Sequence, residues 1–210
     1  MTFPDFFDDV PAIRLRDPLA ELLGAAEEGI MEYRYVDAVR LAGHSCPTVA
    51  GAYLMARAAL NALYPDALPE RGGIAVHMPS PETEGTIGVV AQVLTLLTGA
   101  AAQGGFKGIG GRFVRQGLLS YAMRSGENDG AVRFERLDTG AAVGVLFDAG
   151  RVPADMSQRE HMQAIMQRRE TPEQRAEFAR QWQARVRRIL LEHADDPMMI
   201  RVVPLGDTVA

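Results

Sequence analysis

The chain has 210 residues, of which 47% are hydrophobic and 23% charged, and its formal net charge is −5. This length and composition predict one globular core with at most a small appendage, and the acidic balance argues against nucleic acid as the main partner. The N-terminus shows no signal-peptide pattern, and no apolar run is long enough to span a membrane. We therefore expect no membrane partner. Because a single cysteine cannot form an internal disulfide, we expect a reducing, cytoplasmic setting.

The first half of the chain predicts short elements that lead into one long helix. Residues 17–23 form a short helix capped by aspartate before proline, residues 31–35 form a strand or an extended lead-in, and residues 36–42 form a second short helix. From Pro47 to Tyr64 the chain is apolar nearly all round. Such a helix is expected to be central and buried.

The middle of the chain predicts a small sheet and a second apolar helix. Residues 74–78 form a strand, and residues 86–98 form a helix with one apolar stripe. Residues 132–137 and 142–147 flank a short glycine-bearing turn, which indicates a β-hairpin. Residues 112–124 are compatible with a strand that turns into a helix.

The last third predicts a charged helical tail. Residues 155–169 form a helix, a capping box at Thr171 opens another that extends to about His193, and residues 199–203 form a short strand. We therefore predict an α+β fold, a small mixed or antiparallel sheet on apolar helices with a C-terminal helical extension. The expected division is an α+β domain over 1–150 and an extension over 151–210 that packs on the same domain.

The strongest chemical signal is Gly43-His44-Ser45-Cys46-Pro47, which holds the only cysteine directly before the long helix. A thiol at a helix N-terminus lies near unpaired N–H groups that favour its thiolate. Imidazole and thiolate two residues apart suit zinc or a similar divalent transition metal. The alternative is a buried thiol beside a histidine that only forms hydrogen bonds.

Other residues are candidates to complete such a site. His77, in the strand 74–78, is a possible third metal ligand, although a strand histidine often only forms hydrogen bonds. Glu82 and Glu84 follow it and offer carboxylates, or are solvated loop charges. Lys107 and Gly105 lie in a glycine-rich stretch that suggests contact with a small anionic or polar ligand, or a turn that lets two elements pack.

A family resemblance begins at the same motif. The run Gly-His-Ser-Cys-Pro-Thr-Val-Ala-Gly-Ala-Tyr-Leu-Met-Ala resembles the Gly-His-x-Cys-Pro-Gly-x-x-x-Gly-x-x-Met-Ala signature of the FmdE-like family, which is named after one component of formylmethanofuran dehydrogenase. The likeness covers residues 36–124 and implies an α+β core, a homodimer and a metal at His44 and Cys46. The family's Cys and Asp on the second apolar helix are replaced near Val89 and Gln92, and Thr48 replaces its glycine.

Three functions follow as hypotheses. The first is a zinc-binding homodimer that uses His44, Cys46 and His77, with a small-molecule ligand near Lys107. The second makes Cys46 a catalytic nucleophile with a histidine as its base. The third is a non-catalytic subunit or binding module whose tail helix docks a partner. The resemblance brings no activity with it, because the redox chemistry of the dehydrogenase complex lies in its other components.

Overall fold

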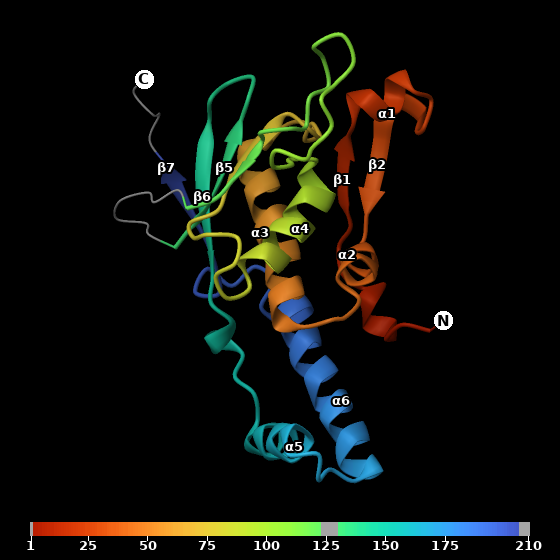
Figure 1. Ribbon diagram of the computed structural model, residues 1–210, viewed down its shortest axis with the longest axis vertical. Coiled ribbons are helices and arrows are strands. Elements are labelled where there is room, and N and C mark those ends of the chain that lie inside the picture. The colour runs from red at the N-terminus through yellow and green to blue at the C-terminus, as the bar shows by residue number, and fades with distance from the viewer. Residues whose placement is uncertain (1, 123–129, 206–210) are drawn as a thin grey trace.

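The computed structural model describes residues 2–122 and 130–205, which fold into helices and two small sheets (Figure 1). The helices are α1 (Pro18–Leu22), α2 (Tyr35–Ala42), α3 (Pro47–Leu63), α4 (Ile87–Thr98), α5 (Met156–Met166) and α6 (Pro172–Arg187). The strands are β1 (Ile13–Arg16), β2 (Ile30–Tyr33), β3 (Ile74–His77), β4 (Leu119–Ser120), β5 (Val132–Arg136), β6 (Ala142–Phe147) and β7 (Ile200–Leu205). The expected α+β class and helical extension are confirmed.

The larger sheet has five strands in the order β4-β3-β5-β6-β7. Only β3 and β4 are parallel, and every other neighbouring pair is antiparallel. The expected hairpin is β5 and β6, paired from Val132 opposite Val145 to Glu135 opposite Ala142. The last strand, β7, pairs with β6, so the chain returns to this sheet after the helical extension.

Helix α3 covers one face of this sheet, as its apolar sequence predicts. Val76 and Phe134 are opposite each other in the register, and both are fully buried on the face toward the helices. A methyl group added at Gly51 of α3 would lie 2.3 Å from the Phe147 ring, so glycine is what lets helix and strand approach this closely. The register of the sheet therefore fixes which side chains face α3.

A second layer lies on the other side of α3 and α4, where the antiparallel pair β1–β2 and helix α2 pack (Figure 1). Tyr35 and Tyr53 meet edge to face in this layer with ring centroids 5.7 Å apart. The Tyr53 hydroxyl donates to the carbonyls of Pro11 and Tyr33. Strand β1 has no counterpart in the sequence-based prediction, whereas the two-residue β4 lies in the segment 112–124 that is compatible with a strand followed by a helix.

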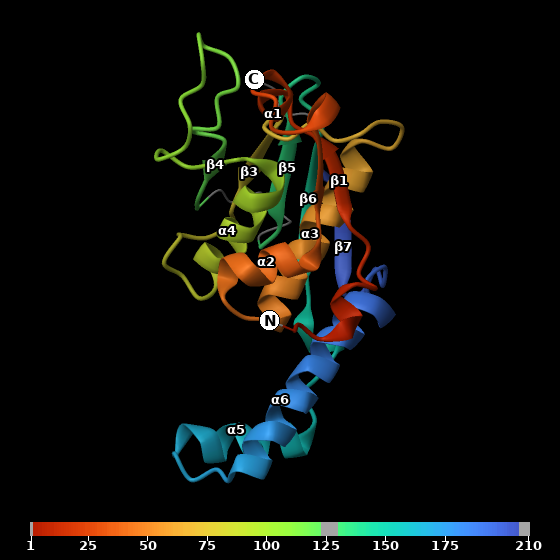
Figure 2. The same cartoon turned by 90° about the vertical axis from the view of Figure 1, so that its right-hand side faces the viewer.

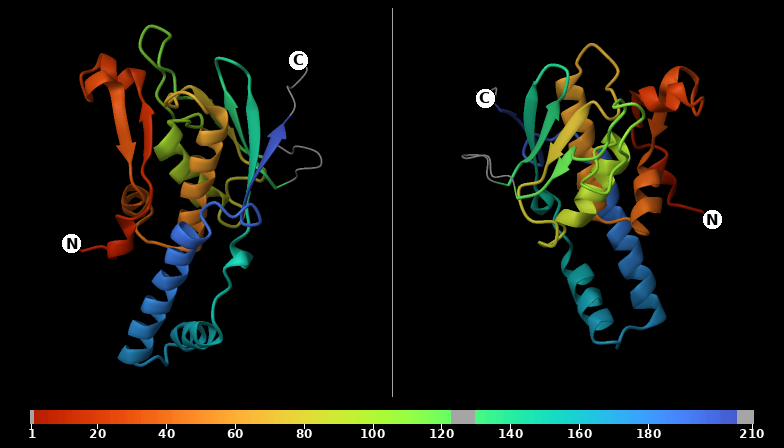
Figure 3. Two further views of the ribbon diagram at one scale, coloured as in Figure 1. Left: turned by 180° about the vertical axis from the view of Figure 1, so that it is seen from behind. Right: turned by 45° about the horizontal axis from the view of Figure 1, so that its top comes forward.

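The helical extension projects from this layered core. Helix α6 runs away from the sheet, and α5 packs across its far end (Figures 2 and 3). A capping box at Thr171 opens α6, as predicted, and residues 188–192 continue it as a wider helical turn. Within residues 2–122 and 130–205, no helix has both the length and the apolarity needed to cross a bilayer. Residues 123 and 124 of the undecided segment 112–124 lie outside the described residues.

Candidate functional site: an arginine-lined cleft

The loop between α2 and α3 leaves the His44 side chain exposed and buries that of Cys46. The His44 ring is exposed, and its Nδ1 donates to the Ala42 carbonyl at 2.9 Å, which leaves Nε2 without a hydrogen-bond partner among the described residues. The Cys46 side chain is buried at the N-terminus of α3, and its sulfur accepts the N–H of Val49 at 3.5 Å. No hydrogen bond of the described residues joins either histidine to this thiol, so the arrangement adds no support for a histidine-activated nucleophile.

Ser45, between them, is held by the helical extension. Its carbonyl accepts the indole N–H of Trp182 at 2.9 Å and the amide of Gln183 at 3.3 Å. Its hydroxyl lies 2.9 Å from the Tyr35 hydroxyl. Helix α6 thus fixes the backbone of the His-x-Cys loop from outside the layered core.

His77 lies on the wrong face of the sheet to join His44 and Cys46. It is opposite Arg133 in the register, whereas its neighbour Val76 is opposite Phe134 on the face that α3 covers. The His77 Nδ1 is 2.7 Å from the Ser120 hydroxyl, and its Nε2 is 3.9 Å from the Glu135 carboxylate. Burial lowers the pKa of His77, and Glu135 opposes this only in part.

The predicted three-ligand metal set is therefore corrected. Across residues 2–122 and 130–205, no three His, Cys, Asp or Glu side chains converge in a way that holds a metal ion. The alternation of side chains along β3 is the physical reason, since a strand residue next to a buried one points away from the covering helix. The roles of His44 and Cys46 as metal ligands stay a prediction.

The other expected ligand residues are also spread out. Lys107 is exposed in the glycine-rich loop, which lies near the end of α3, whereas Cys46 lies at the start of that helix (Figure 1). A methyl group at Gly105 would meet the backbone of Gln116 at 2.9 Å, so this glycine serves close packing. Glu84 is exposed and accepts the hydroxyl of Ser80 at 3.2 Å. These residues and the His-x-Cys pair do not form one site.

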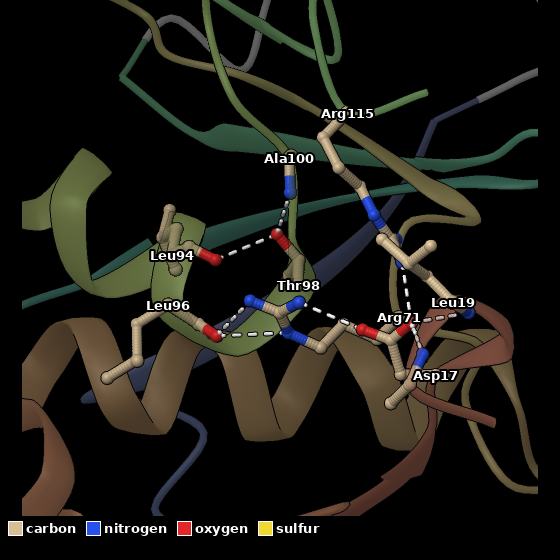
Figure 4. A network of polar contacts seen from close by, with 9 residues as sticks. Asp17, Leu19, Arg71, Leu94, Leu96, Thr98, Ala100 and Arg115 are labelled. Atoms are coloured by element: carbon tan, nitrogen blue, oxygen red, sulfur yellow. Dashed lines mark hydrogen bonds and ion pairs between the residues drawn. The ribbon is translucent and has the colours of Figure 1, made fainter. Parts of the chain in front are cut away.

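A charged network that the sequence did not predict is centred on Asp17, Arg71 and Arg115 (Figure 4). Asp17, only 4% exposed, caps α1 by accepting the N–H groups of Leu19 and Ala20 at 2.9 and 3.2 Å. The same carboxylate accepts Arg115 at 2.7 Å and Arg71 at 2.9 Å. Two guanidinium groups thus share one buried carboxylate, and the network carries one net positive charge.

Local backbone geometry makes room for this network. Gly72 has a φ of +85°, and a methyl group there would fall 1.0 Å from Nη1 of Arg115. Arg71 is held a second time, by the Leu96 carbonyl at the end of α4, at 3.0 and 3.2 Å. Elements distant in sequence therefore meet at Asp17, which explains why no local motif revealed the network.

The electrostatics of Asp17 follow from these contacts. Burial by itself raises the pKa of its carboxyl group, but the hydrogen bond from Arg71 and the charge of Arg115 outweigh burial. The net effect is a pKa below the ordinary value of 3.8, so the group is ionised at neutral pH. Burial likewise lowers the pKa of Arg115, which Asp17 partly offsets, and the guanidinium stays charged.

A cleft of about 570 Å³ opens beside the network. Arg71 and Arg115 line it together with Arg16, Arg112, Glu70 and the apolar side chains of Phe113, Val114, Leu118 and Leu137. Arg16 is paired with Glu21. The Arg112 guanidinium lies 4.9 Å from the centre of the Phe113 ring and has no carboxylate partner among the described residues. A volume of this size and a lining of arginines beside apolar groups are typical of a small-ligand site.

Comparison with other proteins adds nothing to these observations. The chain matches no model of a protein family, no curated protein and no solved structure to which it was compared. The resemblance to the FmdE-like family therefore stays a prediction, and function is inferred from the geometry of the chain itself.

Proposed function

We propose that the protein binds a small organic anion, with a carboxylate or phosphate group, in the cleft lined by Arg71, Arg112 and Arg115. Four guanidinium groups in and around the cleft face three carboxylates, those of Asp17, Glu21 and Glu70, which leaves one positive charge uncompensated. Planar guanidinium groups match carboxylate and phosphate oxygens in pairs.

Arg112 is the observation that carries this proposal. It is exposed on the cleft wall, stacked on Phe113, and without a carboxylate partner in residues 2–122 and 130–205. By contrast, Arg71 and Arg115 already have Asp17 as a partner. The adjoining apolar side chains favour an anion that also carries a ring or another apolar body.

The test is calorimetric titration with phenyl phosphate, benzoate and inorganic phosphate. We expect phenyl phosphate to bind most tightly, and Arg112→Gln to weaken its binding about 10- to 150-fold, because a charged hydrogen bond contributes about 1.5–3 kcal/mol. Arg201→Gln is the matched control, since Arg201 is an exposed arginine on β7, outside the cleft. Equal affinity in wild type and Arg112→Gln contradicts the proposal, as does the absence of binding by all three anions.

A second function is supported by the exposed His44 ring, whose Nε2 has no hydrogen-bond partner in residues 2–122 and 130–205. Its other ring nitrogen is held by a backbone carbonyl, the arrangement that commonly orients a metal-ligating histidine. We propose that His44 and Cys46 bind a divalent transition metal, with zinc the best match to their donor types. Two protein donors leave the remaining coordination positions to water, a small ligand or a second chain.

Elemental analysis tests this second function. We expect purified protein to contain metal in stoichiometric amount, and His44→Ala and Cys46→Ala to lose it. His77→Ala is the matched control, because His77 lies on the opposite face of the sheet and is expected to leave the metal content unchanged. If wild-type protein expressed in zinc-supplemented medium contains no metal, the proposal of metal binding is wrong. If only His77→Ala loses the metal, the assignment of His44 and Cys46 as its ligands is wrong.

A further inference from the structure

The helical extension forms an arm that the layered core covers only at its root. We define the arm as α5, α6 and the turn between them, residues 156–187. Near the core, Arg185 donates to the carbonyls of Val152 at 2.6 Å and Ala149 at 3.1 Å, and Trp182 reaches Ser45. Beyond this root, α5 and the first half of α6 pack mainly on each other (Figures 2 and 3).

Apolar side chains of the arm are left uncovered. Met156 and Met166, at the two ends of α5, are 70% and 71% exposed. Met162, Ile165 and Phe178 are only half-buried, and no apolar residue of α5 is buried. Because two helices in one layer cannot enclose an apolar core, this surface is suited to packing against another element.

The charges of the arm indicate what that element is. The arm, residues 156–187, has seven arginines against four carboxylates, whereas the rest of the chain has 15 basic residues against 23 acidic ones. Among these, Arg159, Arg168 and Arg169 have no carboxylate partner in the described part of the chain. A basic arm on an acidic body is complementary to a second copy of the same chain.

The first turn of the chain offers the matching acidic surface. Asp5, Asp8 and Asp9 lie in and after the short helix at residues 5–7, and all three are exposed. Within residues 2–122 and 130–205, no ion pair joins this turn to the arm. The tip of the arm points away from the N-terminal turn of its own copy (Figure 2).

We propose that the arm docks onto a second copy of this chain, with Arg168 and Arg169 against the partner's Asp8 and Asp9. Each copy supplies one arm and one acidic turn, so the same contact forms twice and the assembly closes as a two-fold dimer. The uncovered methionines of α5 are buried in this contact. This inference does not depend on the anion cleft, which lies at the other end of α3 (Figure 1).

Charge reversal tests the contact. Sedimentation velocity over a range of protein concentrations is expected to show a dimer of the wild type whose dissociation constant rises with salt. The double variant R168E/R169E, which reverses the arm, and the double variant D8R/D9R, which reverses the turn, are each expected to weaken dimerisation about tenfold or more. Arg201→Glu is the matched control and is expected to dimerise as the wild type does.

Mixing the two reversed proteins gives the decisive result. In the mixed pair both contacts again join opposite charges, so an equimolar mixture is expected to form a heterodimer at a concentration where each protein alone is mostly monomeric. Because lost folding is not rescued by mixing, this outcome also shows that both variants are folded. The proposal is overturned if the wild type stays monomeric, if the reversed variants dimerise as tightly as wild type, or if the mixture stays monomeric.

Discussion

Replacing Asp17 by asparagine isolates the charge at the centre of the buried network. The substitution keeps the size of the side chain and the oxygen that caps α1 through Leu19 and Ala20. It removes the negative charge that Arg71 and Arg115 share. It also turns an amide N–H toward Arg71, where two donors then face each other.

The expected loss is large for a change of so few atoms. Breaking a buried ion pair by removing one partner costs about 3–5 kcal/mol, because a buried charge is left uncompensated. Arg115 is 7% exposed and keeps a hydrogen bond to the retained oxygen but loses its counter-charge, whereas Arg71 loses its carboxylate oxygen and keeps its bonds to the Leu96 carbonyl. We therefore expect Asp17→Asn to lower the free energy of unfolding by about 3 kcal/mol at pH 7. Asp17→Ala is expected to lose about 1 kcal/mol more with the helix cap.

The dependence on pH follows from the direction of the pKa shift. Because folding lowers the pKa of Asp17 below 3.8, its stabilising contribution is present above that pH and disappears as the pH falls through the folded value. The difference between wild type and Asp17→Asn is therefore expected to shrink in acid. Urea unfolding followed by circular dichroism at pH 7 and pH 3 measures both quantities. A loss below about 1 kcal/mol at pH 7, or one that does not shrink in acid, would refute the reasoning.

Two further substitutions test the packing of α3 and the root of the arm. Gly51→Ala places a methyl group 2.3 Å from the Phe147 ring, so urea unfolding should show a loss of about 1–3 kcal/mol that Phe147→Leu partly restores. Trp182→Phe removes one donor to the Ser45 carbonyl but leaves Gln183 in place, so thermal unfolding should show a loss of about 1 kcal/mol. A neutral result for either contradicts the corresponding contact.

Most of the helices and strands could be predicted from sequence, because their signals are local. The apolar run and the proline at its first position predict α3 almost to the residue, and the structure ends it at Leu63. The alternating runs around Asp138-Thr139-Gly140 likewise predict β5 and β6. Strand β1 has only four residues and depends on pairing with β2, so its pattern is too short to be distinctive.

The candidate site was harder to predict, since it depends on which face each residue occupies. The sequence predicts the strand 74–78 but not which face of the sheet His77 occupies. The pairing of β3 with β5 places its side chain on the face away from α3. The charged network beside the cleft is formed by Asp17, Arg71 and Arg115, which are separated by up to 98 positions in the sequence. No periodicity or spacing links residues so far apart. The sequence indicates only that Asp17 caps a helix, not that it is buried between two arginines.

The buried network and the proposed anion site share the same arginines, which leads to a stronger test than affinity alone. In Asp17→Asn, Arg71 and Arg115 lose their shared carboxylate next to the cleft, so a bound anion is expected to supply part of the missing charge. Phenyl phosphate should then bind this variant more tightly than wild type and raise its thermal midpoint by more, because a ligand that binds only the folded state stabilises it by mass action. An Asp17→Asn, Arg112→Gln double variant should lose most of this gain. Equal shifts in wild type and Asp17→Asn would mean that the anion, if it binds, does not contact the arginines that Asp17 holds.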